Sequence, residues 1–102
     1  MPAVTRDGDP TTTGHGCDGT TTVTGPTGAS AHVYANGIPV ETQGNPTAPH
    51  TIPAGDACVP HSAVINVGSP NVFVAGIPQA RLGDSTDGGA ITGSSPNVFA
   101  NG

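Results

Sequence analysis

Three of the four histidines, His15, His50 and His61, lie in polar connecting segments and indicate metal chemistry by their type and spacing. His15 follows a Gly-Asp step at residues 8–9, and His50 follows a Gly-Asn step at residues 44–45. His61 precedes an apolar stretch of the chain. Imidazoles that converge from comparable positions could bind a tetrahedral zinc ion, which needs one further ligand.

The fourth ligand stays open among Asp87, Cys58 and Cys17, because zinc accepts both carboxylate and thiolate ligands. The two cysteines could instead form a disulfide. A single histidine in a polar loop is most often solvated, but three placed in register with a sequence repeat favour a metal site. His32 replaces an asparagine of that repeat, so we expect it on the surface.

A sequence repeat organises the whole chain. The pentapeptide Ser-Pro-Asn-Val-Phe occurs at residues 69–73 and 95–99, and a degraded copy lies at 30–34. The last copy stops at the C-terminus, and its missing part resembles residues 1–9, with one extra residue relative to 77–84. We therefore predict that the termini meet and that three units close around a pseudo-threefold axis.

Composition bounds the fold and excludes several functions. A chain of 102 residues supports one domain, residues 1–102, and its 16 glycines and 11 prolines interrupt any helical periodicity. Only 9% of the residues are charged, with a net charge of −5, and lysine is absent, which argues against binding nucleic acid or anionic membranes. There is no signal peptide and no apolar run of membrane-spanning length.

The pattern predicts an all-β domain of short strands with a thin core, so a metal or disulfide staple is expected. In the repeat, Phe73 should face away from Val72 and Val74. Residues 10–27 and 46–67 should be long polar loops. The expected strands are residues 20–24, 32–35, 63–67, 71–75, 90–92 and 97–100.

These residues resemble the PAAR-repeat proteins, which cap the spikes of contractile phage tails and of type VI secretion systems. Pro78-Gln79-Ala80-Arg81 resembles the Pro-Ala-Ala-Arg signature, and residues 5–9 with Gly14-His15-Gly16-Cys17 look like the N-terminal block of the phage members. The resemblance covers essentially the whole chain, although Pro39-Val40-Glu41-Thr42 lacks the signature arginine.

The resemblance implies a small cone of short β-strands with one metal ion near its apex. The family site has three histidines and one cysteine, and His15, His50 and His61 match the histidines. Where the cysteine is expected, this chain has Ser-Thr-Asp-Gly, so Asp87 or Cys58 would replace it. The metal is expected to be zinc, with iron as the alternative.

The resemblance further implies a structural role and no enzymatic activity. We expect a tip in the virion that caps a trimeric β-helical spike, one cap per trimer, and that meets the target cell envelope transiently. The alternative is the tip of a type VI secretion spike, which also recruits effectors and starts in the bacterial cytoplasm. A zinc hydrolase is the third hypothesis, but catalytic zinc keeps an open position, and this chain has enough ligands to close the site.

Overall fold

The computed structural model describes residues 2–25 and 33–100, and within these ranges the chain is all-β and contains no helix. None of the described residues therefore belongs to a helix that could cross a membrane. Each strand pairs antiparallel with a strand next to it in the sequence, and each described sheet has two strands. The strands are β1 (Pro10–Thr12), β2 (Thr20–Thr22), β3 (Tyr34–Ala35), β4 (Ile38–Pro39), β5 (His50–Ala54), β6 (Ala57–His61), β7 (Phe73–Val74), β8 (Ile77–Pro78), β9 (Ser85–Thr86) and β10 (Gly89–Ala90).

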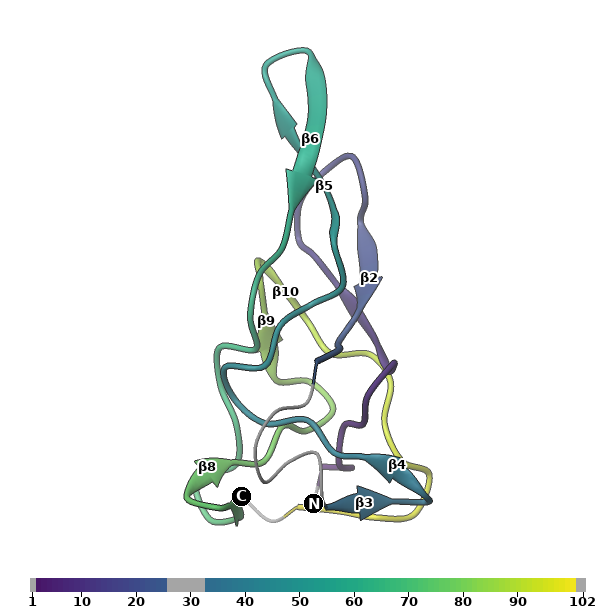
Figure 1. The fold of residues 1–102 in the computed structure, drawn as a ribbon, viewed down its shortest axis with the longest axis vertical. Coiled ribbons are helices and arrows are strands. Elements are labelled where there is room, and N and C mark those ends of the chain that lie inside the picture. The colour runs from purple at the N-terminus through teal and green to yellow at the C-terminus, as the bar shows by residue number, and fades with distance from the viewer. Residues whose placement is uncertain (1, 26–32, 101–102) are drawn as a thin grey trace.

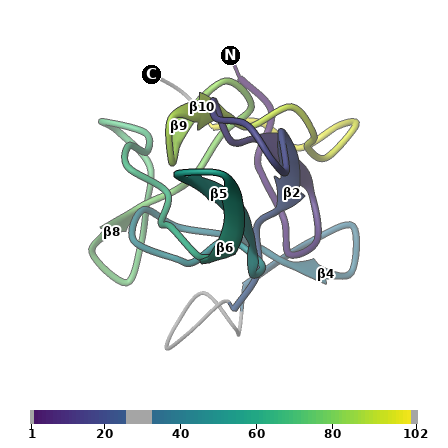
Figure 2. The same cartoon turned by 90° about the horizontal axis from the view of Figure 1, so that it is seen from above.

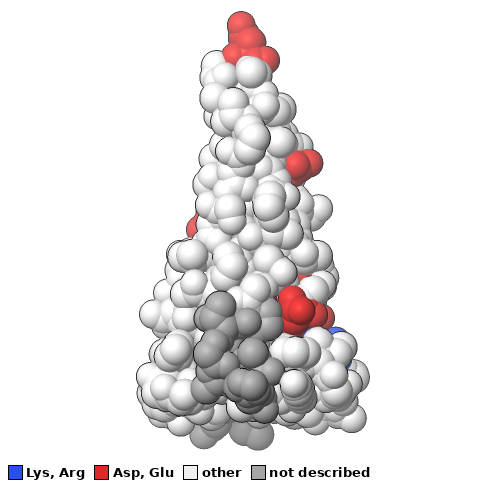
Figure 3. Space-filling model, viewed as in Figure 1, with Lys and Arg blue, Asp and Glu red and all other residues white. Residues whose placement is uncertain are grey.

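The molecule is elongated, with extents of 42 × 24 × 21 Å, and it tapers along its long axis (Figure 1). The broad end carries β3, β4 and β8, and the β5–β6 hairpin forms the narrow end. Seen from above, β4, β8 and the C-terminal segment project in three directions around that hairpin (Figure 2). Acidic atoms lie at the tip of the narrow end, where the turn of the hairpin carries Asp56 (Figure 3).

A closed ring of backbone hydrogen bonds joins three segments of the body. Thr5 N donates to Ala80 O (3.1 Å), Ala80 N donates to Glu41 O (3.0 Å), and Glu41 N donates to Thr5 O (3.0 Å). Each segment thus donates to one neighbour and accepts from the other. Because the ring closes on itself, none of the three segments is left with an unpaired edge at this level.

Each segment of the ring continues into a tight turn in which glycine adopts a positive φ. The φ angles are +86° at Gly8, +91° at Gly44 and +90° at Gly83, a region that glycine enters without steric cost. In two of the turns an arginine pairs with the aspartate three residues later, with N–O distances of 3.3 Å in Arg6–Asp9 and 2.8 Å in Arg81–Asp84. The predicted turns at the Gly-Asp and Gly-Asn steps are confirmed.

The two ends of the chain pair with each other, as the repeat predicts. Val4 N donates to Val98 O (2.8 Å), and Ala100 N donates to Pro2 O (2.9 Å). Residues 5–8 match 80–83 without an insertion, so this stretch does not contain the extra residue predicted within residues 1–9. The ring and the turns place both ends of these two segments in equivalent positions, so no residue can be added between them.

The prediction that residues 10–27 and 46–67 form long polar loops is wrong, because β1 and β2 lie in the first stretch. The second stretch contains β5 and β6, the longest strands described. The hairpin projects beyond the body, so neither face of it needs an alternating apolar pattern. Residues 63–67, expected as a strand, form only isolated bridges at Val64 and Ile65.

The core consists of two small apolar clusters, and neither receives a residue from the β5–β6 hairpin. Val74 is buried and Val72 packs against the same cluster, whereas Phe73 is about half exposed at 52%, which confirms the predicted alternation. The narrow end therefore lacks an apolar core of its own among the described residues. The clusters are Val4, Ala35, Val40, Val74 and Ala100, and Val23, Ile65, Ala80 and Ile91.

Candidate metal centre

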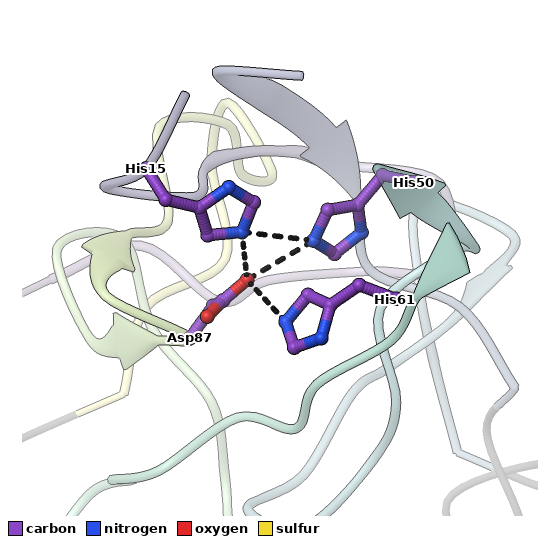
Figure 4. A group of neighbouring side chains, drawn as sticks. All are labelled: His15, His50, His61 and Asp87. Atoms are coloured by element: carbon purple, nitrogen blue, oxygen red, sulfur yellow. Dashed lines mark hydrogen bonds and ion pairs between the residues drawn. The ribbon is translucent and has the colours of Figure 1, made fainter. Parts of the chain in front are cut away.

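Three separate segments bring four potential ligands together (Figure 4). His15 lies in the loop between β1 and β2. His50 begins β5 and His61 ends β6, and the two are paired in register across the hairpin. Asp87 lies in the turn between β9 and β10. The hairpin thus supplies two imidazoles, and the other two segments supply one ligand each.

The three imidazoles converge on one carboxylate oxygen of Asp87. Asp87 Oδ2 lies 2.8 Å from His15 Nε2, 3.0 Å from His50 Nε2 and 3.2 Å from His61 Nε2. The Nε2 atoms of His15 and His50 are 3.3 Å apart. A tetrahedral ion with bonds of about 2.0–2.1 Å holds its ligand atoms about 3.4 Å from one another, so the spacing suits one small ion at the centre.

The outer ring nitrogens of two histidines are held by backbone carbonyls. His15 Nδ1 lies 2.9 Å from Gly16 O, and His50 Nδ1 lies 2.9 Å from Ala48 O. A carbonyl can only accept, so each Nδ1 carries a proton and each Nε2 faces the centre, where it donates to Asp87 when it is protonated and presents a lone pair to an ion when it is not. Lone pairs that face one another and a carboxylate repel unless a proton or a cation lies among them. Histidines that bind metals typically have the outer ring nitrogen held in this way.

The electrostatics of the cluster keep Asp87 ionised. Burial is the largest single influence on the Asp87 pKa and raises it, but hydrogen bonds from His15 and His50 together with imidazole charge outweigh it, and the pKa lies below its ordinary value. The hydrogen bond with the Gly16 carbonyl chiefly raises the pKa of His15, burial opposes the rise, and Asp87 adds to it. An ionised carboxylate is the form that binds a metal.

A close backbone contact sets the loop of His15 against the turn of Asp87. Gly88 N donates to Thr13 O (2.9 Å), and a Cβ on Gly14 would lie 2.0 Å from Gly88 O. Gly14 also has a φ of +75°. Only glycine allows the two segments to approach this closely while His15 and Asp87 reach the same centre.

The structure brings together His15, His50, His61 and Asp87, and it leaves Cys58 out. Cys58 is wrong as a candidate ligand, because its sulfur is bonded to Cys17 with a Cα–Cα distance of 5.9 Å and offers no thiolate. The same bond removes Cys17 from the alternatives and makes the disulfide the correct reading of the two cysteines.

Two further residues of the site were not identified from the sequence. Asp18 Oδ2 accepts hydrogen bonds from Thr51 N and Thr51 Oγ1, both at 2.9 Å, and Asp18 N donates to Thr51 O (3.2 Å). These bonds join the loop of His15 to β5 beside His50. Neither residue type is distinctive by itself, so the sequence contains no signal for this contact. His32, expected at the surface, lies outside the described residues.

No protein-family model matches the chain, and no curated protein is similar to it in sequence. The function is therefore inferred from the geometry of the chain. Its four clustered ligand atoms suit a metal ion, and no pocket opens among the described residues. Four ligands complete a tetrahedral site, an arrangement typical of structural rather than catalytic zinc.

Proposed function

We propose that the chain is a PAAR-type tip: a conical, pseudo-threefold β-domain that holds one zinc ion near its apex and caps a trimeric spike with its broad end. His15, His50, His61 and Asp87 would hold the ion, and iron is the alternative metal. The bound ion would crosslink three segments and stiffen the narrow end. The role is mechanical, and no catalytic step is assigned to the site.

The observation that carries this proposal is the closed backbone ring of Thr5, Glu41 and Ala80. Three short segments of one chain hydrogen-bond in a cycle, and the paired termini complete the third unit. A single chain with three equivalent faces matches a homotrimer, whose three subunits present the same surface three times. The matching stoichiometry is one cap per trimer.

The broad end presents the surface that such a partner would need. Tyr34, Phe73 and Phe99 occupy the same position in the three units, each directly before a buried residue, and their exposed fractions are 54%, 52% and 51%. Aromatic side chains supply a large apolar area at protein interfaces. Three equivalent rings, one per unit, would contact three equivalent sites on a trimer.

We propose the tip of a phage tail spike in the virion as the location, with transient contact with the target cell envelope. A type VI secretion spike, where the tip would also recruit effectors, is the alternative, because it presents a trimeric end of the same symmetry. Neither nucleic acid nor stable residence in a membrane is part of the proposal. A zinc hydrolase is disfavoured, because the four proposed ligands leave no open position for water.

Light scattering on a mixture of the chain with the C-terminal β-helix of a cognate spike tests the proposal. We expect a mass of one chain per trimer. Phe73→Ser should weaken capping at least tenfold, whereas Val59→Ser, on the exposed hairpin, should not. A mass of three chains per trimer, or equal capping by the two variants, would contradict the proposed broad-end interface.

A further inference from the structure

The disulfide connects two of the three segments that carry the ligands, although it is not itself part of the cluster. Cys17 lies two residues after His15, and Cys58 lies three residues before His61. The two cysteines are separated by 41 positions in the sequence. In the hairpin register Cys58 pairs with Pro53, so the bond reaches β6 beyond the cluster, toward the hairpin turn.

The loop of His15 is held by hydrogen bonds and by the disulfide, without apolar packing. Glycines at residues 14, 16 and 19 surround His15 and Cys17, and none of residues 13–19 belongs to an apolar cluster. Cys17 itself has a φ of 64°, a backbone conformation that a non-glycine residue rarely adopts unless its surroundings impose it. The hydrogen bonds of Asp18 to Thr51 tie the loop to β5, and the disulfide ties it to β6.

We infer that the Cys17–Cys58 disulfide is a positioning device for the metal centre, which holds His15 against the hairpin and so sets the affinity for the ion. This inference rests on the metal site proposed above. His50 and His61 are paired by the hairpin itself, whereas His15 must be brought in from a separate loop. If the disulfide is intact, the loop is already ordered when the ion binds. If the disulfide is broken, the loss of entropy on ordering the loop opposes binding of the ion.

The affinity for zinc should therefore depend on the redox state of the two cysteines. A phosphine reduces the disulfide to two thiols and is oxidised to the phosphine oxide, with water supplying the oxygen and the two protons. We expect the double variant Cys17→Ser/Cys58→Ser to bind zinc about 10–100-fold more weakly than the oxidised protein, the range seen when groups that orient metal ligands are removed. Val59→Ser, adjacent to Cys58 and 37% exposed, should bind like the unmodified chain.

Competition with a chromophoric chelator measures these affinities, and cobalt(II) absorption reports the coordination geometry. The double variant should lose intensity in the tetrahedral cobalt bands as His15 disengages, which a general loss of stability would not produce in protein that stays folded. Reduced protein, freed of phosphine, provides the second measurement if the double variant does not fold. Because its free thiols can bind metal, the reduced protein is compared with the oxidised protein only by the cobalt bands of tetrahedral nitrogen and oxygen ligands, which should lose intensity.

The outcomes separate the two proposals. If the oxidised protein binds neither zinc nor cobalt, the metal site fails, and the inference fails with it. If the oxidised protein binds the ion and the double variant binds it equally tightly with the same cobalt spectrum, the metal site stands and the positioning role of the disulfide is refuted. Weaker binding with a changed spectrum supports both.

Discussion

The broad body and the narrow end of this molecule are stabilised by different means. The body has two apolar clusters and a closed ring of backbone hydrogen bonds. The narrow end has the β5–β6 hairpin, a disulfide and a cluster of three histidines and an aspartate, with no buried apolar residue within residues 50–61. As the cross-section shrinks, there is too little volume to bury apolar side chains, and crosslinks replace packing.

The two regions also differ in how closely they follow the repeat. In the body, Thr5, Glu41 and Ala80 occupy equivalent positions and make the same backbone bonds. At the cluster the equivalence is lost, because one hairpin supplies both His50 and His61. Three repeats can therefore form the body, but a four-ligand site needs an arrangement that threefold repetition alone does not provide.

Removing a metal ligand should produce the largest effect and should be confined at first to the narrow end. We expect His50→Ala, which deletes the most buried of the three imidazoles, to lower the free energy of unfolding by about 4 kcal/mol or more, as is typical when a structural metal is lost. Thermal unfolding with and without a chelator measures this. The chelator should destabilise the unmodified chain to the same degree and leave His50→Ala unchanged.

Hydrogen exchange shows which region of the His50→Ala variant is destabilised. In His50→Ala, amides of β5 and β6 should lose protection, while the ring amides of Thr5, Glu41 and Ala80 stay protected. If both regions lose protection together, the body and the narrow end form one cooperative unit and are not stabilised separately.

The buried carboxyl of Glu41, one of the three ring residues, should make the body sensitive to pH. Glu41 is fully buried; its Oε2 accepts a hydrogen bond from Asn45 Nδ2 (2.7 Å), and its Oε1 has no partner among the described residues. Burial raises the pKa of Glu41 to about 8, a shift that Asn45 opposes and that Asp7 and Asp9 reinforce.

The direction of the pH effect follows from the raised pKa. Between about pH 4.5 and pH 8 the unfolded chain has lost this proton and the folded chain keeps it, so stability should fall as the pH rises through that window, by about 2–5 kcal/mol. Glu41→Gln keeps an acceptor for Asn45 and removes the titration. The difference between the two proteins in urea unfolding, measured at several pH values with chelator present, should grow toward pH 8. A constant difference would mean that Glu41 is ionised in the fold.

Much of the body could be predicted from the sequence, because equal segments adopt equal local geometry. The Gly-Asp and Gly-Asn turns, the pairing of the termini and the outward-facing Phe73 follow from the repeat and from glycine stereochemistry. The three histidines could be grouped because they lie in related connecting segments. The all-β class followed from the density of glycine and proline.

The narrow end was harder to predict, for physical reasons. Residues 53–60 of the β5–β6 hairpin are exposed, so they leave no alternating pattern to recognise, and Pro53 and Pro60 argue against strands. Whether Cys58 bonds to a metal or to Cys17 depends on distances between side chains 41 positions apart, which no local pattern encodes.

Alanine substitutions at two glycines should have smaller effects on the free energy of unfolding, and they distinguish a steric clash from an unfavourable backbone conformation. Gly14→Ala places a methyl group 2.0 Å from Gly88 O, where backbone would have to move, whereas Gly44→Ala meets no atom within 4 Å. Both have positive φ. We expect losses in unfolding free energy of about 3 kcal/mol for Gly14→Ala and about 1 kcal/mol for Gly44→Ala. Only Gly14→Ala should also weaken zinc binding, because it separates His15 from Asp87; equal binding by the two variants would contradict this.

The smallest effects on the free energy of unfolding are expected at two adjacent residues of the body. Val74 is 7% exposed and belongs to an apolar cluster, whereas Phe73 is 52% exposed. Val74→Ala should reduce the free energy of unfolding by about 1–2 kcal/mol through lost burial and a cavity. Phe73→Ser, despite removing more atoms, should cost about 0.5 kcal/mol, because its ring already faces water. Urea denaturation of both variants measures the difference. If Phe73→Ser is the more damaging, the ring is packed in solution and does not stand free for a partner at the broad end.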